Sequence, residues 1–315
     1  MKIAMCQTNP VLLDVGANVE NTIASIKKCK EKGADLIVFP ELALTGYFVG
    51  LHYHEAALQM ESPEIRRIAA ATKGTAAVVG FIEESRSMNF YNSALVAVDG
   101  QIQFAYRKLN LPNYGVFEER KFFASGKHIR VFRLGGLNIA VFICNDLWHP
   151  SLPYLGIAQK ADIFLTLFNS SEGSMADEFS NMESWEIINR FYSRIFGIYN
   201  ICVNRVGEEG PEQVRCRAAK DNETSFPDAF RLPEVQKTYH FWGGSEIVNP
   251  FGLVTHSAKK FEEDTVLGSI SKNMLRRKKI VLPYLKNDDP YFTHRELGRI
   301  LYAPGEKQPW QRKKD

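Results

Sequence analysis

Three polar residues of different chemistry, Glu41, Lys108 and Cys144, each stand where an apolar run of the sequence gives way to polar residues. Such runs predict buried strands, and in α/β proteins the crevice outside the strand ends is where ligands bind and react. A thiol becomes a good nucleophile when a base takes its proton or a cation lowers its pKa. An ammonium also suits the negative oxygen of a tetrahedral intermediate. The three side chains therefore form a candidate catalytic set.

Each of these residues also has a simpler interpretation. Cys144 is consistent with a small core residue, because free cysteine is among the most buried residue types. Glu41 is consistent with a solvated loop carboxylate and Lys108 with a surface lysine. A papain-like pairing of cysteine with histidine is disfavoured, because only His149 of the seven histidines lies near Cys144 in the sequence.

The apolar pattern predicts an alternation of strands and helices, which is typical of an α/β fold. Asp99-Gly100 and Gly135-Gly136 each separate two apolar runs and predict hairpins, which indicate mixed rather than purely parallel sheets. In the predicted helix at residues 176–196, we expect Ile187 and Phe191 to pack in the core. Strands are predicted at residues 2–7, 34–39, 75–82, 89–98, 101–106, 129–134, 137–144, 161–168, 199–203, 239–248, 253–257 and 265–270. Helices are predicted at residues 18–32, 63–72, 150–160 and 176–196.

No repeat, linker or shift in composition divides the chain, so we expect one large domain over residues 1–272. From about residue 208 to residue 238 the pattern has no sustained period, which predicts a mobile surface insertion or a lid over the site. Residues 273–315 are expected to form a C-terminal helix and a tail that is partly disordered or contacts another subunit.

The composition is that of a soluble globular protein, with 45% hydrophobic and 24% charged residues in a chain of 315. The net charge of +3 gives no reason to expect nucleic acid as a partner, and the basic run 276–279 is expected on the solvated face of a helix. No apolar stretch approaches the roughly 18 residues of a membrane span. The N-terminus lacks a signal-peptide core, which predicts a cytoplasmic protein. Five scattered cysteines without a CxxC pair predict neither a disulfide framework nor a zinc site.

Five segments of the sequence, taken together and in order, resemble the nitrilase superfamily of carbon-nitrogen hydrolases. The likeness is greatest to its amidase members and to the glutaminase domain of glutamine-dependent NAD synthetases, and it covers about residues 1–272. The segments are FPELALTGY (39–47), YRKLNLPNYGVFEERKFF (106–123), ICNDLW (143–148), NRVG (204–207) and FWGGSEIVNPFG (241–252).

This resemblance implies a four-layer αββα sandwich with a Glu-Lys-Cys triad. On matching positions Glu41 is the general base, Lys108 the oxyanion stabiliser and Cys144 the nucleophile. The second glutamate of the family aligns with Glu119, which is expected to orient the lysine and the substrate. The amide of Asn145 is expected to join Lys108 in the oxyanion hole.

Further expectations follow for the substrate site and for partners. Tyr114 and Asn169 are expected to contact the substrate or the oxyanion. The implied chemistry uses no metal and no organic cofactor. Family members pack two sandwiches into dimers, so the resemblance implies a homodimer or a higher homo-oligomer, with the tail after Tyr302 as a candidate contact.

The residue after the cysteine bears on the substrate. True nitrilases resemble one another in having tryptophan there, whereas this chain has Asn145, which favours amides over nitriles. The leading hypothesis is a free-standing amidase that cleaves a small linear carboxamide through a thioester and releases ammonia and a carboxylic acid. One alternative is an N-carbamoyl amine hydrolase. Another is a glutaminase subunit that feeds ammonia to a separate synthetase chain, because the sequence ends without the Ser-Gly-Gly-type phosphate loop of a synthetase.

Overall fold

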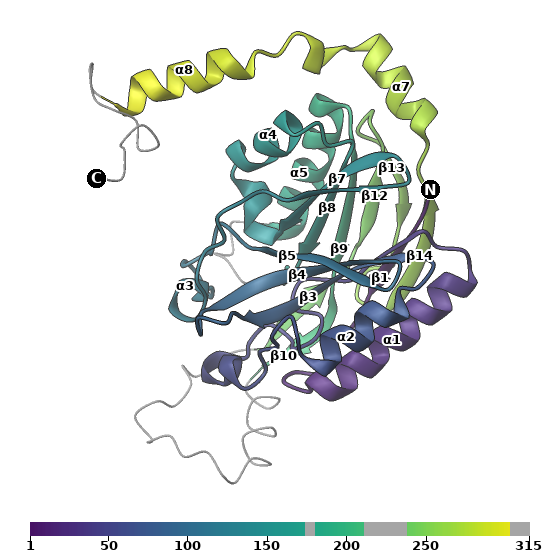
Figure 1. The fold of residues 1–315 in the computed structure, drawn as a ribbon, viewed down its shortest axis with the longest axis vertical. Helices are drawn as coiled ribbons and strands as arrows, with labels where there is room; N and C mark the ends of the chain where they lie inside the picture. Colours follow the sequence, from purple (N-terminus) through teal and green to yellow (C-terminus); the bar gives the residue numbers. More distant parts are fainter. Residues whose placement is uncertain (174–179, 211–237, 303–315) are drawn as a thin grey trace.

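A computed structural model describes residues 1–173, 180–210 and 238–302. Two six-stranded mixed sheets pack face to face and helices cover their outer faces, as expected of an αββα sandwich (Figure 1). The first sheet has the order β14-β1-β2-β3-β4-β5 and the second the order β13-β12-β9-β8-β7-β6. Strands of the first sheet are β1 (Lys2–Gln7), β2 (Leu36–Val38), β3 (Ala76–Glu84), β4 (Phe90–Val98), β5 (Gln101–Arg107) and β14 (Asp264–Ser269). Those of the second are β6 (Val131–Leu134), β7 (Leu137–Ile143), β8 (Ile163–Phe168), β9 (Tyr199–Asn204), β12 (Glu246–Val248) and β13 (Val254–Ser257).

The core has three apolar layers because both faces of each sheet are covered. Side chains such as Val78 of β3 and Val141 of β7 meet between the sheets. Helices α1 (Val15–Glu31) and α2 (Pro63–Ala71) bury Ile26 and Ile68 against the outer face of the first sheet. Helices α4 (Ser151–Ala158) and α5 (Asn181–Phe196) cover the second sheet in the same way. Strands covered on both faces read as continuous apolar runs, which is why the sequence predicted them.

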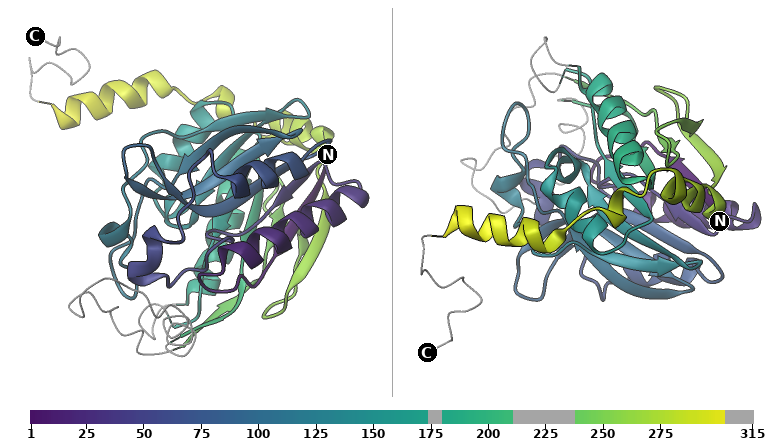
Figure 2. Two further views of the ribbon diagram at one scale, coloured as in Figure 1. Left: turned by 60° about the horizontal axis from the view of Figure 1, so that its bottom comes forward. Right: turned by 90° about the horizontal axis from the view of Figure 1, so that it is seen from above.

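Several smaller elements complete the described chain. Strands β10 (Val206–Glu209) and β11 (Tyr239–Trp242) form a separate antiparallel pair. Short helical turns are η1 (Gly50–His54), α3 (Glu119–Phe122), η2 (Cys144–Trp148) and η4 (Tyr284–Lys286). Helices α7 (Lys272–Val281) and α8 (Pro290–Leu301) end the described chain, and α8 extends away from the sandwich (Figures 1 and 2). Among the described residues, no helix has the length and apolar character needed to span a bilayer.

The structure corrects the strand assignments on either side of residues 211–237. The predicted strand 239–248 is two strands, since Gly243 and Gly244 have positive φ angles and separate β11 from β12. The expected irregular segment 208–238 begins inside strand β10. Most of that segment, residues 211–237, lies outside the described residues, as do residues 303–315 of the tail.

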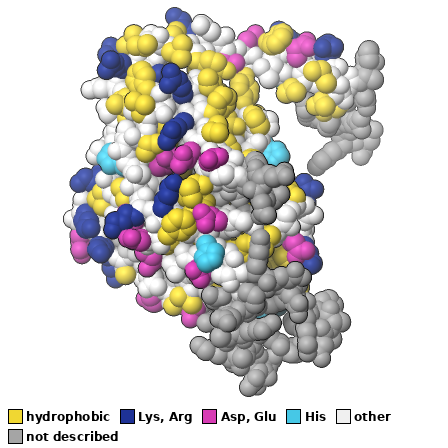
Figure 3. Space-filling view, turned by 180° about the vertical axis from the view of Figure 1, so that it is seen from behind, with side chains coloured by type: hydrophobic (Ala, Val, Ile, Leu, Met, Phe, Trp, Pro, Cys, Tyr) yellow, Lys and Arg dark blue, Asp and Glu magenta, His cyan; other side chains and the backbone are white. Residues whose placement is uncertain are grey.

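Two expectations about helix faces are also wrong. Ile187 and Phe191 of α5 are exposed, at 68% and 50%, because the helix turns Trp185 and Tyr192 toward the core instead. Hydrophobic side chains gather on the upper half of the face seen in Figure 3. In the basic run, Lys278 is buried and lies 5.2 Å from the centre of the Phe251 ring, whereas the other three cations are exposed.

Gly80 of β3 supports the turn that carries Glu41. A Cβ atom at Gly80 would overlap the carbonyl oxygen of Pro40 and the backbone nitrogen of Leu42. The Gly80 carbonyl also accepts the N–H of Leu44 at 3.2 Å, so this turn lies directly on the strand. Only a residue without a side chain permits that approach.

We therefore expect Gly80→Ala to destabilise the fold by about 1–3 kcal/mol, because the added methyl group must displace backbone rather than a flexible side chain. Thermal unfolding measures this loss. Gly16→Ala is the matched control, because a Cβ there meets only Asp14 Oδ1 at 3.8 Å in the first turn of α1. A Gly80→Ala protein as stable as the Gly16→Ala protein would contradict the close approach.

Candidate active site

Glu41 lies in a tight turn after β2 and its side chain is completely buried. Its Oε1 accepts hydrogen bonds from Lys108 Nζ and Asn92 Nδ2, both at 2.7 Å. Its Oε2 accepts the backbone N–H of Asn169 at 2.8 Å. Leu42, the next residue, has a φ of +48°, so the turn holds the carboxylate at the cost of backbone strain.

Lys108 follows directly on β5 and is also completely buried. Its ammonium contacts two carboxylates, Glu41 and Glu119, at 2.7 Å each. Its backbone is fixed on both sides, since its N–H donates to the Asn92 carbonyl at 2.9 Å and its carbonyl accepts the Gly126 N–H at 2.8 Å. The ammonium is therefore held without exposure to water.

Cys144 directly follows strand β7 and is the first residue of the turn η2. Its φ of +43° is unusual for a residue with a side chain, and such strain is found at functional turns. Cys144 is half-buried, unlike Cys6, Cys29 and Cys202, which are fully buried. A strained strand-to-helix turn that presents a nucleophile is a known arrangement in hydrolases.

Asp146 ties the cysteine turn to the chain that follows Lys108. Its buried carboxylate accepts the backbone N–H groups of Leu109 at 3.0 Å, of Asn110 at 2.8 Å and of Ile143 at 3.1 Å. It also accepts the hydroxyl of Tyr106 at 2.7 Å. A single carboxylate thus fixes the thiol and the ammonium relative to each other.

Glu119 is the second carboxylate on Lys108 and is held in turn by Tyr47, whose hydroxyl donates to its Oε1 at 2.7 Å. The loop that carries Tyr47 is anchored by Glu209, which accepts the Tyr47 N–H at 3.1 Å and the Phe48 N–H at 2.8 Å. Glu209 is itself buried in an ion pair with Arg205. The orientation of Glu119 therefore depends on strand β10.

The charges in this site shift the pKa values of its members. Burial opposes the charge on Lys108, but Glu119 and Glu41 outweigh that effect and raise its pKa well above the usual value. Burial raises the pKa of Glu119, and the Lys108 ammonium opposes this shift. Burial and then the negative charge of Glu41 raise the pKa of the Cys144 thiol well above its usual value. Both effects favour the neutral form of this thiol.

The remaining site residues expected from the sequence have different surroundings. The side chain of Asn145 is occupied, since its Oδ1 accepts the Tyr114 hydroxyl at 2.8 Å and its Nδ2 donates to the Asn110 carbonyl at 3.2 Å. Asn145 can therefore serve an oxyanion only through its backbone N–H. Tyr114 is about half exposed. Asn169 contributes a backbone N–H to Glu41, whereas its side-chain amide is buried and has no hydrogen-bond partner within the part of the chain that the structure describes.

Sequence reasoning missed three residues of this network, Asn92, Tyr47 and Asp146. Tyr47 and Asp146 lie inside the family segments, and their polar groups next to the aligned residues were an available signal. Asn92 lies within a predicted strand, where a single polar residue is equally consistent with a solvated face.

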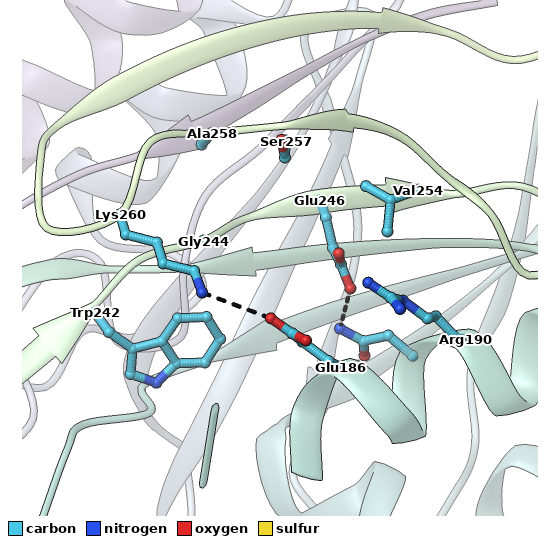
Figure 4. Close-up of a pocket in the computed structure, with 10 residues that line it drawn as sticks. Glu186, Arg190, Trp242, Gly244, Glu246, Val254, Ser257, Ala258 and Lys260 are labelled. Atoms are coloured by element: carbon cyan, nitrogen blue, oxygen red, sulfur yellow. Dashed lines mark hydrogen bonds and ion pairs between the residues drawn. The ribbon is translucent and has the colours of Figure 1, made fainter. Parts of the chain in front are cut away.

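A hollow of about 220 Å³ lies between α5 and strands β12 and β13 (Figure 4). The charges that line it are largely paired, because Lys260 lies 3.6 Å from Glu186 and Glu246 accepts a hydrogen bond from Asn189 at 2.9 Å. None of Glu41, Lys108, Glu119 and Cys144 lines it. This hollow is separate from the candidate active site.

The profile of the carbon-nitrogen hydrolase family matches residues 2–279, so the chain belongs to that family of enzymes, within the nitrilase superfamily. It is similar to the glutamine-dependent NAD(+) synthetase of Thermotoga maritima, with 26% identity over 98% of this chain and 49% of that protein. The corresponding synthetase of Xylella fastidiosa is 43% identical over 47% of this chain and 28% of its own length. The chain thus spans about half the length of the synthetases or less.

Solved structures show the same fold. A carbon-nitrogen hydrolase superfamily protein from Xanthomonas campestris superposes with a TM-score of 0.73 at 20% identity, over 92% of this chain and 97% of that one. An amidase from Nesterenkonia superposes with a TM-score of 0.70 at 20% identity, over 94% and 96% of the two chains. The expectation of a nitrilase-type αββα sandwich with mixed sheets is confirmed.

The buried charges make a prediction about stability. Lys108→Met leaves Glu41 and Glu119 buried without their cation, which we expect to cost about 3–5 kcal/mol at neutral pH. Unpaired buried carboxyl groups bind protons more tightly in the folded protein than in the unfolded chain, where glutamate titrates near about 4.3. The loss should therefore be smallest near that pH and should grow as the pH rises. Urea unfolding at several pH values measures it, and a loss independent of pH would contradict the buried pairing.

Proposed function

We propose that this chain is a cysteine-dependent amidase that cleaves the C–N bond of a small linear carboxamide. The observation that carries the proposal is the buried contact of Glu41 with Lys108, next to a thiol on a strained turn. A base, a cation and a nucleophile held in one place are what acyl transfer from an amide requires.

The proposed reaction begins when Glu41 takes the proton of the Cys144 thiol as the sulfur attacks the amide carbon. The Lys108 ammonium and the backbone N–H of Asn145 stabilise the resulting oxyanion. The C–N bond then breaks, Glu41 returns the proton to the leaving nitrogen, and ammonia departs from a thioester on Cys144. Water, deprotonated by Glu41, attacks the thioester and releases the carboxylic acid and the thiol.

The raised pKa of Cys144 supports general-base catalysis over a preformed thiolate. A thiol that is neutral at rest must lose its proton during attack, so the base has to lie next to it. The alignment of Glu41 supplies such a base, and its Oε2 is fixed by the Asn169 N–H rather than by a solvent contact. Asn145 in place of tryptophan after the cysteine favours amides over nitriles among the substrates.

A glutaminase that supplies ammonia to a synthetase is the second candidate. The 26% identity to the Thermotoga maritima synthetase extends over 98% of this chain, which supports glutamine as the amide. In that case another polypeptide or a further domain uses the ammonia. Hydrolysis of an N-carbamoyl amine is a third candidate with the same residues, and it releases carbon dioxide as well as ammonia.

An ammonia-release screen over linear amides, glutamine, N-carbamoyl amines and nitriles tests these candidates. We expect an amide to be turned over and Cys144→Ala to lose at least about 10⁴-fold in rate, since a nucleophile removed from a concerted site has no substitute. Cys144→Ala should keep the thermal stability of the native protein within about 1 kcal/mol. An active Cys144→Ala protein would exclude the proposal, and activity that appears only with an added partner would favour the glutaminase.

We also propose that the hydrolase domain ends at about residue 272 and that the helices beyond it join subunits. Helix α8 exposes large apolar side chains along its length, which is unusual for a surface that remains in water. These side chains are Tyr291, Phe292, Leu297, Ile300 and Leu301, exposed between 51% and 79%. A homodimer or higher homo-oligomer would bury them.

Replacement of Leu297 and Leu301 by glutamate should therefore lower the oligomeric mass, because buried charges at an apolar contact are costly. Light scattering at micromolar concentration measures the mass. Met88→Glu is the control, since Met88 is also an exposed apolar residue, at 76%, and lies on the turn between β3 and β4. A native protein that is a monomer at micromolar concentration would contradict this assembly.

A further inference from the structure

Asn92 of strand β4 contacts both carboxylates of the candidate active site. It is completely buried, and its Nδ2 donates to Glu41 Oε1 at 2.7 Å and lies 3.4 Å from Glu119 Oε2. Its backbone carbonyl accepts the N–H of Lys108 at 2.9 Å. One residue therefore contacts both carboxylates through its side chain and the backbone of Lys108 through its carbonyl.

The charges of the site show why such a donor is useful. Glu41 and Glu119 share the single ammonium of Lys108, so the three buried groups carry one excess negative charge when both carboxylates are ionised. The Cys144 thiol and the Tyr47 hydroxyl lie beside them and contribute no positive charge. A hydrogen bond to a carboxylate favours its charged form. An asparagine amide donates that hydrogen bond without adding a charged or titratable group to the site.

The oxygen of the Asn92 side-chain amide is evidence against a purely structural role for this residue. Its Oδ1 is buried and has no hydrogen-bond partner among the described residues. An unsatisfied buried acceptor lowers stability, so a residue selected for stability alone would have its two ends paired or would be apolar. The neighbouring Ser93, which points to the opposite face, is paired with Glu83 Oε2 at 2.7 Å.

We propose that Asn92 is a positioning residue for the reaction: its amide orients the Glu41 carboxylate toward the Cys144 thiol while Lys108 is shared with Glu119. The inference rests on the proposed function, since it assigns Glu41 the role of base toward Cys144. Asn92 acts through Glu41 and does not touch the reacting amide.

Asn92→Leu tests the proposal, because leucine has a similar volume and no donor. Loss of the hydrogen bond disfavours the ionised carboxylate, so the acidic limb of kcat/KM against pH should move up by about one pH unit. At the pH of the native optimum, kcat/KM should fall about tenfold or more. Asn92→Asp, which is isosteric and replaces the donor by a third carboxyl group, should move the limb at least as far.

A second measurement needs no substrate. The rate at which iodoacetamide alkylates Cys144 near neutral pH, followed by peptide mass, reports how readily the neighbouring base takes the thiol proton. We expect this rate to fall in Asn92→Leu and Asn92→Asp. This readout separates the two proposals, because alkylation can slow as expected even in a protein that cleaves no amide.

Ser93→Ala is the matched control. It removes a buried hydrogen bond from the same strand, so its thermal stability should fall while the kcat/KM profile against pH and the alkylation rate stay at their native values. If Asn92→Leu does not fold, the isosteric Asn92→Asp variant carries the test. Unchanged alkylation rates in the folded Asn92 variants, or an equal fall in Ser93→Ala, would overturn the inference.

Discussion

The contact of one buried ammonium with two buried carboxylates is the constraint on which the rest of this site depends. Lys108, Glu41 and Glu119 are each at least 96% removed from water. Desolvated charges are costly unless their partners and hydrogen bonds are complete, so the protein must hold all three groups in fixed positions. Nearly every polar contact described around the site serves that requirement, from the Asn169 N–H to the Tyr47 hydroxyl.

These groups come from both sheets, and the sandwich brings them together. Glu41 and Lys108 follow strands of the first sheet, whereas Cys144 and Asn169 follow strands of the second. The apolar layer between the sheets sets the distance between the two sets, and Asp146 then fixes the register by binding backbone from both. The close backbone approach at Gly80 and the positive φ angle at Cys144 then set the positions of Glu41 and of the thiol. The geometry of the site is therefore determined mainly by the packing of the sheets, and backbone strain is confined to these turns.

The sequence predicted much of this fold for a physical reason. Strands covered on both faces, such as β3 and β8, are continuous apolar runs, and the polar residues that follow them mark the sheet edge. The sequence failed where polarity and burial disagree. Strand β10 contains Glu209, which is buried because it forms an ion pair with Arg205. A charged residue in this position gave no strand pattern in the sequence, so the segment was predicted to be irregular. Asn92 was missed because it too is polar and buried. Ile187 and Phe191 were misplaced because an apolar residue on a helix does not always face the core of the protein.

The neutral state of the Cys144 thiol has a consequence for the durability of such an enzyme. Peroxide attacks the thiolate far more readily than the thiol, so a nucleophile whose pKa lies well above its usual value is resistant to oxidation at rest. In the proposed reaction a neighbouring carboxylate removes the thiol proton, which would confine the reactive form to the moment at which an acyl group is present to accept it. A half-buried cysteine that was ionised permanently would gain reactivity and lose this protection. The same burial that would make the sulfur dependent on a base would therefore also protect it between turnovers.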